Sequence, residues 1–453
     1  MSGEVLRSKR TPHIKAKTAA NNAQPSISRM RGVREIRANL PRESIPRLCG
    51  RWLKQEEKKY KMKYKINTMT IASIMAITLL SCGSEGKGLA EQKMAPQVVA
   101  VSDTIPNKVD TVDTVTSLTQ STVQEAKSVS TTKTTYESAF DELNQMLEEK
   151  QPQDLKRAVF LVENAWHGGT LSYENYCSQI SEIVETLRSM VQNKGIGHYK
   201  TAGNWAAHTY LCKPVPENEN EPYIYDFDDP YGDKDYSKTF VTKLLNTKKG
   251  TCHSLPLLYK ILTDEYGGEV SHLAVAPNHL YIKHKDEYNK WYNLELTNGH
   301  FSTDAWIISS SHIKAEAIAN RVYMHGLNQK ESIAICMTDI AGAYLNKYGY
   351  GHNDRFVLRC LGAAIKANPV YIVAIAEKSN VLSQQLLKEC KARDIPHFKY
   401  AKDVPELKSL ALQVEALYKQ TDDLGYEEMP REQYSEWVTK MQSKSSIHKQ
   451  TSN

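Results

Sequence analysis

The sequence lacks a hydrophobic run long enough to cross a membrane comfortably, which takes about 20 mainly apolar residues. The uncharged stretch Ile66–Ser81 is shorter and contains several Thr, Ser and Asn residues. Metal-binding spacings such as CxxC are also lacking, although the chain has 8 cysteines. These absences exclude a multi-span membrane protein and give no cysteine-based metal site. We expect neither a metal nor a cofactor.

Outside its N-terminal part, the chain also lacks a large excess of positive or negative charge. The formal net charge is +6, but residues 1–61 hold 16 Lys and Arg against 5 Asp and Glu. This leaves the other 392 residues with a net charge of −5. A nucleic-acid partner is therefore not indicated by the basic pI. With 40% apolar and 24% charged residues, the composition is that of a globular protein, which excludes collagen and wholesale disorder.

Residues 62–81 read as a secretory signal peptide. Lys63 and Lys65 precede the uncharged stretch, which ends at Leu79-Leu80-Ser81-Cys82. This ending resembles the lipobox of bacterial lipoproteins, in which the cysteine is lipid-modified and becomes the mature N-terminus. The resemblance implies lipidation of Cys82 and a lipid anchor in the membrane of a bacterial cell envelope. A plain signal peptide or an uncleaved anchor is the alternative.

The segments on either side of this signal are not expected to fold. Residues 1–61 are basic and without apolar periodicity, so that Met62 is the simplest natural start; a genuine basic tail is the alternative. Residues 82–135 are rich in Ser, Thr and Val, and they are predicted to be a disordered tether. Residues 431–453 form a predicted tail.

Residues 136–312 are predicted to form an α+β domain that begins with helices. Apolar residues recur at helical spacing in three successive segments. Their predicted buried positions are Phe140, Leu143, Met146 and Leu147; Leu155, Ala158, Val159 and Val162; and Ile180, Ile183, Val184, Leu187 and Val191. A fourth, shorter helix is expected around Asn204–Leu211. The polar loop Lys213–Asp235 follows, and its five aspartates favour a solvated acidic turn over a calcium loop, since the EF-hand glycine is missing.

The segment Phe240–Ile308 carries the residues that point to chemistry. Cys252 opens a predicted helix, because Pro256 is tolerated only in a first helical turn. A helix N-terminus favours the thiolate form of a cysteine. Its neighbour His253 points about 100° away on the helix, which makes it a poor base. Alternating residues predict strands at Val270–Ala276, Leu280–His284 and Lys290–Leu296, with His272 packed inside the first.

The last two strands are predicted to pair as an antiparallel hairpin centred on Glu287. In this register His279 faces Glu295, at a Cβ separation of roughly 4.5–5.5 Å. The other predicted pairs are Tyr281–Asn293 beside it, and Leu280–Leu294 and Ile282–Tyr292 on the apolar face. A thiol at a helix start, a histidine on a strand and a carboxylate behind it are the parts of an activated nucleophile.

These residues resemble the core of the transglutaminase-like (papain-like) superfamily. The resemblance covers residues 225–312 and lies in Gly250-Thr251-Cys252, Pro277-Asn278-His279 and Trp291-Tyr292-Asn293-Leu294-Glu295-Leu296-Thr297. It implies a cysteine-bearing helix packed on an antiparallel sheet. It also implies that Cys252 is the nucleophile, His279 the general base and acid, and Glu295 the carboxylate that orients His279. The family uses Asp at this last position, and Asn293 is the alternative orienting residue.

Residues 313–430 are predicted to form a flanking helical domain. Helices are expected at Ala315–Asn320, Ile333–Leu345, Phe356–Ala367, Tyr371–Glu389 and Leu407–Tyr418. The second and third resemble a tetratricopeptide unit with a lengthened turn, and an ordinary helical bundle is the alternative. Either surface would be expected to bind a protein partner. The other mature cysteines, Cys177, Cys212, Cys336, Cys360 and Cys390, are expected to be core packing, with disulfides as the alternative.

The transglutaminase-like resemblance implies a cysteine hydrolase or acyltransferase that acts on amide bonds through a thioester on Cys252. The lipobox resemblance implies that this enzyme is anchored in the cell envelope. The expected substrate is a protein or peptide. Hydrolysis is favoured over crosslinking, because bacterial relatives of this core are more often peptidase-like. The alternative is a catalytically inert scaffold that binds envelope proteins through the helical domain.

Overall fold

The computed structural model describes residues 135–230, 232–427, 436 and 439. The basic extension, the signal peptide, Cys82, nearly all of the tether and most of the predicted tail lie outside the described residues. The α+β class predicted from the sequence is confirmed for the described part, in which helices and small antiparallel and parallel sheets occur together. None of the described helices has the length and apolar content that a membrane span requires.

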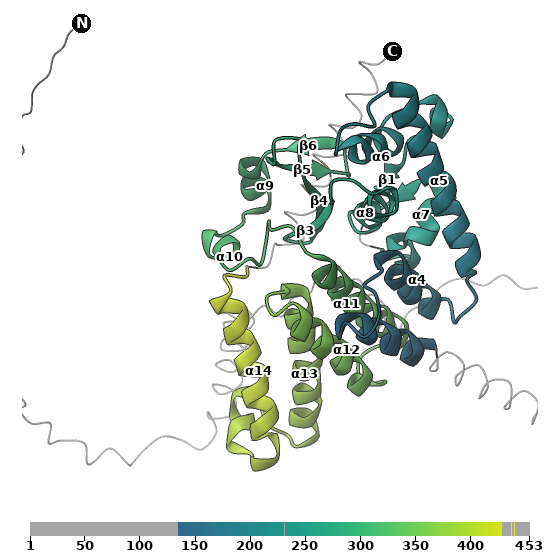
Figure 1. The fold of residues 1–453 in the computed structure, drawn as a ribbon. Helices are drawn as coiled ribbons and strands as arrows, with labels where there is room; N and C mark the ends of the chain where they lie inside the picture. Colours follow the sequence, from purple (N-terminus) through teal and green to yellow (C-terminus); the bar gives the residue numbers. More distant parts are fainter. Residues whose placement is uncertain (1–134, 231, 428–435, 437–438, 440–453) are drawn as a thin grey trace, which may run out of the picture. The chain divides into compact units, whose positions relative to one another are not determined.

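The first helices lie where the apolar periodicity predicts them (Figure 1). Residues 135–147 are helical, and they are followed by α4 (Leu155–Trp166), α5 (Tyr173–Lys194) and α6 (Ala202–Cys212). Every residue that was predicted for the apolar faces of the first three is buried. Asp154 and Ser172 cap α4 and α5 by accepting backbone N–H bonds, as expected for these residue types.

Two short strands were not predicted, because two residues are too few to show an alternating pattern. They are β1 (Ile224–Tyr225) and β2 (Lys249–Gly250), which pair in parallel. The 3-10 helices Pro216–Asn218 and Tyr236–Thr239 and the helix α7 (Val241–Thr247) lie around them. The helix α8 (Ser254–Tyr266) follows β2 and is almost wholly buried up to Thr263.

The main sheet is a four-stranded antiparallel meander in the order β3-β4-β5-β6. Its strands are β3 (His272–Ala276), β4 (His279–Lys285), β5 (Trp291–Glu295) and β6 (His300–Ser302). The helix α8 packs on β3 and β4 (Figure 1). Six of the seven residues of β4 are buried, so both faces of this strand are covered.

The predicted C-terminal helices are all present. After α9 (Asp304–Ser311) and α10 (Ala315–Ala319) come α11 (Gln329–Tyr348), α12 (Asp354–Ala367), α13 (Ile372–Ala392) and α14 (Pro405–Asp423). The 3-10 helix Phe398–Asp403 precedes α14. Each of the four helices from α11 to α14 packs on the next one (Figure 1). A tetratricopeptide arrangement stays a prediction.

One continuous apolar core joins the sheet region to α11. It runs from Tyr136 to Val381, and it includes buried residues of α4, α8, β4 and α11. A second, smaller cluster lies between α13 and α14, from Leu382 to Val414. The helix α11 packs directly on α4. The boundary predicted between residues 312 and 313 stays a prediction, and the apolar core continues across it.

Candidate active site

Cys252 lies in the turn just before the buried helix α8, which begins at Ser254 and has His253 as its N-cap. The Thr251 hydroxyl oxygen accepts N–H bonds from His253 at 3.2 Å and from Ser254 at 3.5 Å, while the Ser254 hydroxyl accepts the Thr251 N–H at 3.0 Å. This reciprocal arrangement caps the turn that leads into α8. Leu255 donates its N–H to the Thr251 carbonyl, four residues back. The helix itself begins at Ser254, two residues after the start predicted at Cys252.

Gly250 fixes the chain just before the cysteine. It pairs with Tyr225, and its carbonyl accepts the N–H of Asp226 at 2.7 Å. A Cβ atom at this position would lie 2.8 Å from the Ser254 hydroxyl oxygen and 2.8 Å from Leu244. Only glycine leaves room for the cap that holds the first turn of α8.

A tight turn places His279 beside Cys252. Ala276 and His279 pair across the β3–β4 hairpin, and only Pro277 and Asn278 lie between them. Asn278 has φ 55°, a left-handed conformation that Asn tolerates better than most residues. The Cys252 thiol donates to the Asn278 carbonyl oxygen at 3.9 Å. The turn thus brings the cysteine to the start of β4.

The predicted register of the next hairpin is wrong by two residues. The observed pairs include Ile282↔Leu294 and His284↔Tyr292, so the hairpin is centred one residue later than expected. A shift of two residues preserves the alternation of side chains between the faces of the sheet. His279 and Glu295 therefore stay on one face as diagonal neighbours, and the His279 Nε2 to Glu295 Oε2 distance is 2.6 Å.

The His279–Glu295 pair is buried and strongly polarised. Burial lowers the pKa of His279, but the Glu295 carboxylate and hydrogen bonds with Cys252 and Glu295 outweigh it and raise this pKa to about 10. Burial raises the pKa of Glu295, whereas the charge and hydrogen bonds of His279 and Thr297 bring it below its ordinary value. The pair therefore favours an imidazolium beside a carboxylate.

Thr297 orients the Glu295 carboxylate, which in turn contacts His279. Its N–H and hydroxyl donate to Glu295 Oε1 at 3.1 Å and 2.7 Å, which leaves Oε2 for His279. Asn293, the alternative orienting residue, donates instead to the Ser302 carbonyl at 3.1 Å and to Asp304 at 2.7 Å. Its role in orienting His279 stays a prediction, and the hydrogen bonds described for it run to other residues.

A second histidine–carboxylate pair involves the residue that follows Cys252. The His253 Nε2 atom is 3.1 Å from the Asp339 carboxylate of α11, and its Nδ1 atom is 3.3 Å from the Thr239 carbonyl oxygen. No sequence motif predicts this pair, because its members are 86 positions apart. His272 is engaged elsewhere, with Nδ1 at 2.9 Å from the Leu327 carbonyl and its ring against Trp291.

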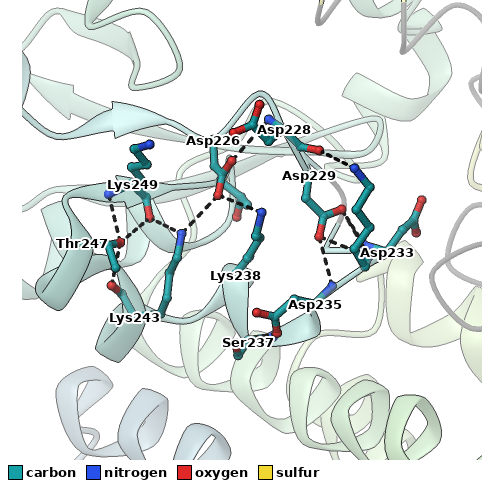
Figure 2. A network of polar contacts seen from close by, with 12 residues as sticks. Asp226, Asp228, Asp229, Asp233, Asp235, Ser237, Lys238, Lys243, Thr247 and Lys249 are labelled. Atoms are coloured by element: carbon teal, nitrogen blue, oxygen red, sulfur yellow. Dashed lines mark hydrogen bonds and ion pairs between the residues drawn. The ribbon is translucent and has the colours of Figure 1, made fainter.

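Two aspartates of the acidic loop before the cysteine have hydrogen-bond or ion-pair partners within the protein (Figure 2). Asp229 is buried and accepts backbone N–H bonds from Asp233, Lys234 and Asp235. The buried Asp226 lies within 3.4 Å of the Lys238 ammonium and 3.2 Å of the Lys243 ammonium. The expectation of a fully solvated turn is therefore wrong for these two aspartates. Across residues 135–230 and 232–427, no cluster of His, Cys, Asp or Glu side chains is arranged to hold a metal ion.

The six cysteines of the described residues differ in exposure. None of them forms a disulfide, and Cys336, Cys360 and Cys390 are buried in the C-terminal helices. Burial raises the pKa of the Cys212 thiol to about 12 and raises that of the Cys336 thiol well above its ordinary value. Cys252 is half-buried, as are Cys177 and Cys212. Of these three half-buried thiols, Cys252 is the one that contacts the turn leading to His279.

Comparison with known proteins gives no relative: no family model, no curated protein and no solved structure matches this chain. The transglutaminase-like resemblance therefore depends on the residues and geometry of the site itself.

Proposed function

We propose that the chain is an envelope-anchored, cysteine-dependent amide hydrolase or acyltransferase with a transglutaminase-like core. The observation that carries this proposal is the buried His279–Glu295 pair, with 2.6 Å between Nε2 and Oε2, which follows directly on the turn whose Asn278 carbonyl accepts the Cys252 thiol. Further support comes from Cys252, which is half-buried and lies two residues before α8, at the helix N-terminus whose dipole favours a thiolate.

The reaction starts from a thiolate beside an imidazolium, because the pKa of His279, raised to about 10, keeps its ring protonated at neutral pH. Glu295 engages Nε2 of His279, and Nδ1 carries the proton given up by the Cys252 thiol. The thiolate then attacks the amide carbonyl carbon. As the carbon–nitrogen bond breaks, His279 returns its proton to the leaving amine, and the acyl group remains on Cys252 as a thioester.

The thioester is resolved by a second nucleophile. In hydrolysis a water molecule gives a proton to His279 and attacks the carbonyl, and the carboxylic acid leaves as the thiol of Cys252 is restored. In transamidation an amine takes the place of water. The substrate in both cases is a protein or peptide amide, and Glu295 keeps the imidazole ring oriented through both halves of the reaction.

Thiol reactivity tests this proposal without a known substrate. The full chain is treated with iodoacetamide, and the rate of modification is measured at each cysteine by peptide mass spectrometry. Cys252 should react much faster than Cys177, which is also half-buried but has no imidazole partner described in a hydrogen bond with it. His279→Gln should slow Cys252 by about 100-fold and leave Cys177 unchanged.

The opposite result would favour the inert scaffold. If Cys252 and Cys177 react at equal rates in the native protein, or if His279→Gln has no effect on Cys252, the thiol is not activated. The protein would then act as a binding module, with the helices α11 to α14 as its partner surface.

The anchor is tested separately, because Cys82 lies outside the described residues. Cys82→Ala should move the protein from the membrane pellet into the soluble envelope fraction, since the described helices offer no other span. Cys49→Ala, a change upstream of the predicted signal peptide, is the matched control. A Cys82→Ala protein that stays in the pellet would contradict the lipid anchor.

A further inference from the structure

The imidazole of His253 lies between two hydrogen-bond acceptors. A backbone carbonyl oxygen cannot donate, so Nδ1 must carry the hydrogen that faces Thr239 at 3.3 Å. Nε2 faces the Asp339 carboxylate at 3.1 Å, and it too must donate when that carboxylate is ionised. Both contacts are satisfied at once only by the doubly protonated ring, which is a cation.

This cation sits next to the nucleophile in the chain. His253 follows Cys252 directly, and its counter-charge comes from α11, the helix that packs on α4. The charge of Cys252 is among the causes that raise the pKa of His253, so the two groups interact. A nearby positive charge favours the thiolate.

A small cavity surrounds the pair and shows which other groups face it. It is lined by Tyr236, Glu163 of α4, Cys336 of α11 and several apolar side chains. Glu163 accepts the N–H groups of Val241 and Thr242 at 2.6 Å and 2.8 Å, so its carboxylate already serves the first turn of α7. Asp339 is therefore the carboxylate of the cavity within hydrogen-bond distance of His253.

The pKa of His253 agrees with this geometry. Burial lowers it, but the charge and hydrogen bond of Asp339, the Thr239 carbonyl and the charge of Cys252 together raise it to about 9. Burial likewise raises the pKa of Glu163 to about 7, against the opposing effects of its N–H bonds and of His253. At neutral pH His253 is thus cationic.

We propose that His253 and Asp339 are a positioning pair that ties the N-cap of α8 to α11 and keeps the thiol of Cys252 reactive. This inference deepens the proposed function and rests on it. It gives the C-terminal helices a part in the site, since one of them supplies Asp339.

The test follows the alkylation rate of Cys252 against pH in the full chain. His253→Gln removes the charge but keeps a side chain that can donate to Thr239. It should move the midpoint of the rate profile upward by about one pH unit, which makes alkylation about tenfold slower below the midpoint. Asp339→Asn should shift the profile in the same direction, and Asp339→Glu should restore it.

Two further measurements make the result decisive. The double variant should shift no more than His253→Gln alone, because both residues act through one contact. Thermal unfolding identifies any variant that fails to fold, and in that case the contrast between Asp339→Asn and Asp339→Glu decides. Unshifted profiles in the folded variants would overturn the positioning pair.

His279→Gln in the same series separates this inference from the proposed function. If His279→Gln leaves the rate unchanged while His253→Gln shifts the profile, the catalytic assignment fails and the positioning pair stands. If His279→Gln slows the reaction and the His253 and Asp339 variants match the native profile, the assignment stands and the positioning pair fails.

Discussion

Two histidine–carboxylate pairs flank Cys252, and they are built differently. His279 and Glu295 lie on adjacent strands of one sheet, with 6% and 4% of their side chains exposed and 2.6 Å between the paired atoms. His253 and Asp339 come from two helices, with 31% and 22% exposed and 3.1 Å between them. We call His279 and Glu295 the strand pair, and His253 and Asp339 the helix pair. Thr297 donates a hydrogen bond to the strand pair, whereas the helix pair lines a cavity.

The difference in burial decides what each pair does for the fold. A buried pair that loses one member leaves an uncompensated charge without water, so the remaining partner destabilises the fold strongly. A pair near solvent is screened, and water replaces the lost partner at little cost. The strand pair therefore couples reactivity to stability, while the helix pair can be altered with the fold intact.

Matched alanine substitutions give the largest expected contrast. Glu295→Ala should lower the free energy of unfolding by about 3–5 kcal/mol, because His279 stays buried without its partner. Asp339→Ala should lower it by about 1 kcal/mol or less. Urea denaturation of both variants measures the contrast, and equal losses would contradict the distinction between the two pairs.

The pH dependence of stability should separate the two histidines. Each has a folded pKa raised above its unfolded value of about 6.5, so its contribution is complete below that pH. The contribution of His253 is lost as the pH rises through about 9, and that of His279 as it rises through about 10. The lowered pKa of Glu295 adds stability that is lost only in acid, as the pH falls through its folded value.

Denaturation curves of three proteins across this alkaline window test the assignment. The native chain should lose stability throughout, on the order of a few kcal/mol in total. His279→Gln should lose less, with the remaining decline ending near pH 9, and His253→Gln should keep the decline that extends to pH 10. Identical slopes in all three proteins would show that neither pair titrates on unfolding.

The glycine before the nucleophile offers a smaller effect. Gly250→Ala should cost about 1–3 kcal/mol, because its Cβ would meet the Ser254 hydroxyl and Leu244 at 2.8 Å. It should also slow alkylation of Cys252, since the cap of α8 is displaced. Gly362→Ala is the matched control in α12: nothing lies within 4 Å, and a gain of about 0.5–1 kcal/mol is expected. A harmless Gly250→Ala would contradict the close packing.

The smallest expected effect concerns the turn before His279. Asn278→Ala should cost about 1 kcal/mol, because its φ of 55° is unfavourable for a residue with a Cβ and no local polar side chain. Asn278→Gly should be close to neutral in thermal unfolding. If alanine and glycine behave alike at this position, backbone strain is not what selects Asn.

Much of the fold could be predicted because its helices are long and periodic. The apolar residues of α4 and α5 that were predicted from spacing are buried, and every expected C-terminal helix is present. The strands β1, β2 and β6 were missed, since two or three residues carry no measurable alternation. Their partners are set by tertiary contacts instead.

The site could be predicted in part, for reasons visible in its residues. The register error arose in the turn, where Asp286 accepts the N–H groups of Tyr288 and Lys290 and so sets a loop of the expected length that lies one residue later. The register error does not affect the pairing of His279 with Glu295, because a shift of two residues keeps both side chains on one face of the sheet. Asp339 was beyond prediction, since only packing of α11 on α4 brings it to His253.

The continuous core has a practical consequence for anyone who expresses fragments of this chain. Val159 and Val162 of α4 line a cavity together with Cys336 of α11, and both valines are buried. A recombinant fragment that stops before Gln329 would leave this apolar surface of α4 open to water, together with the side of His253 that α11 covers. Such a fragment should collect in inclusion bodies even though it contains Cys252, His279 and Glu295.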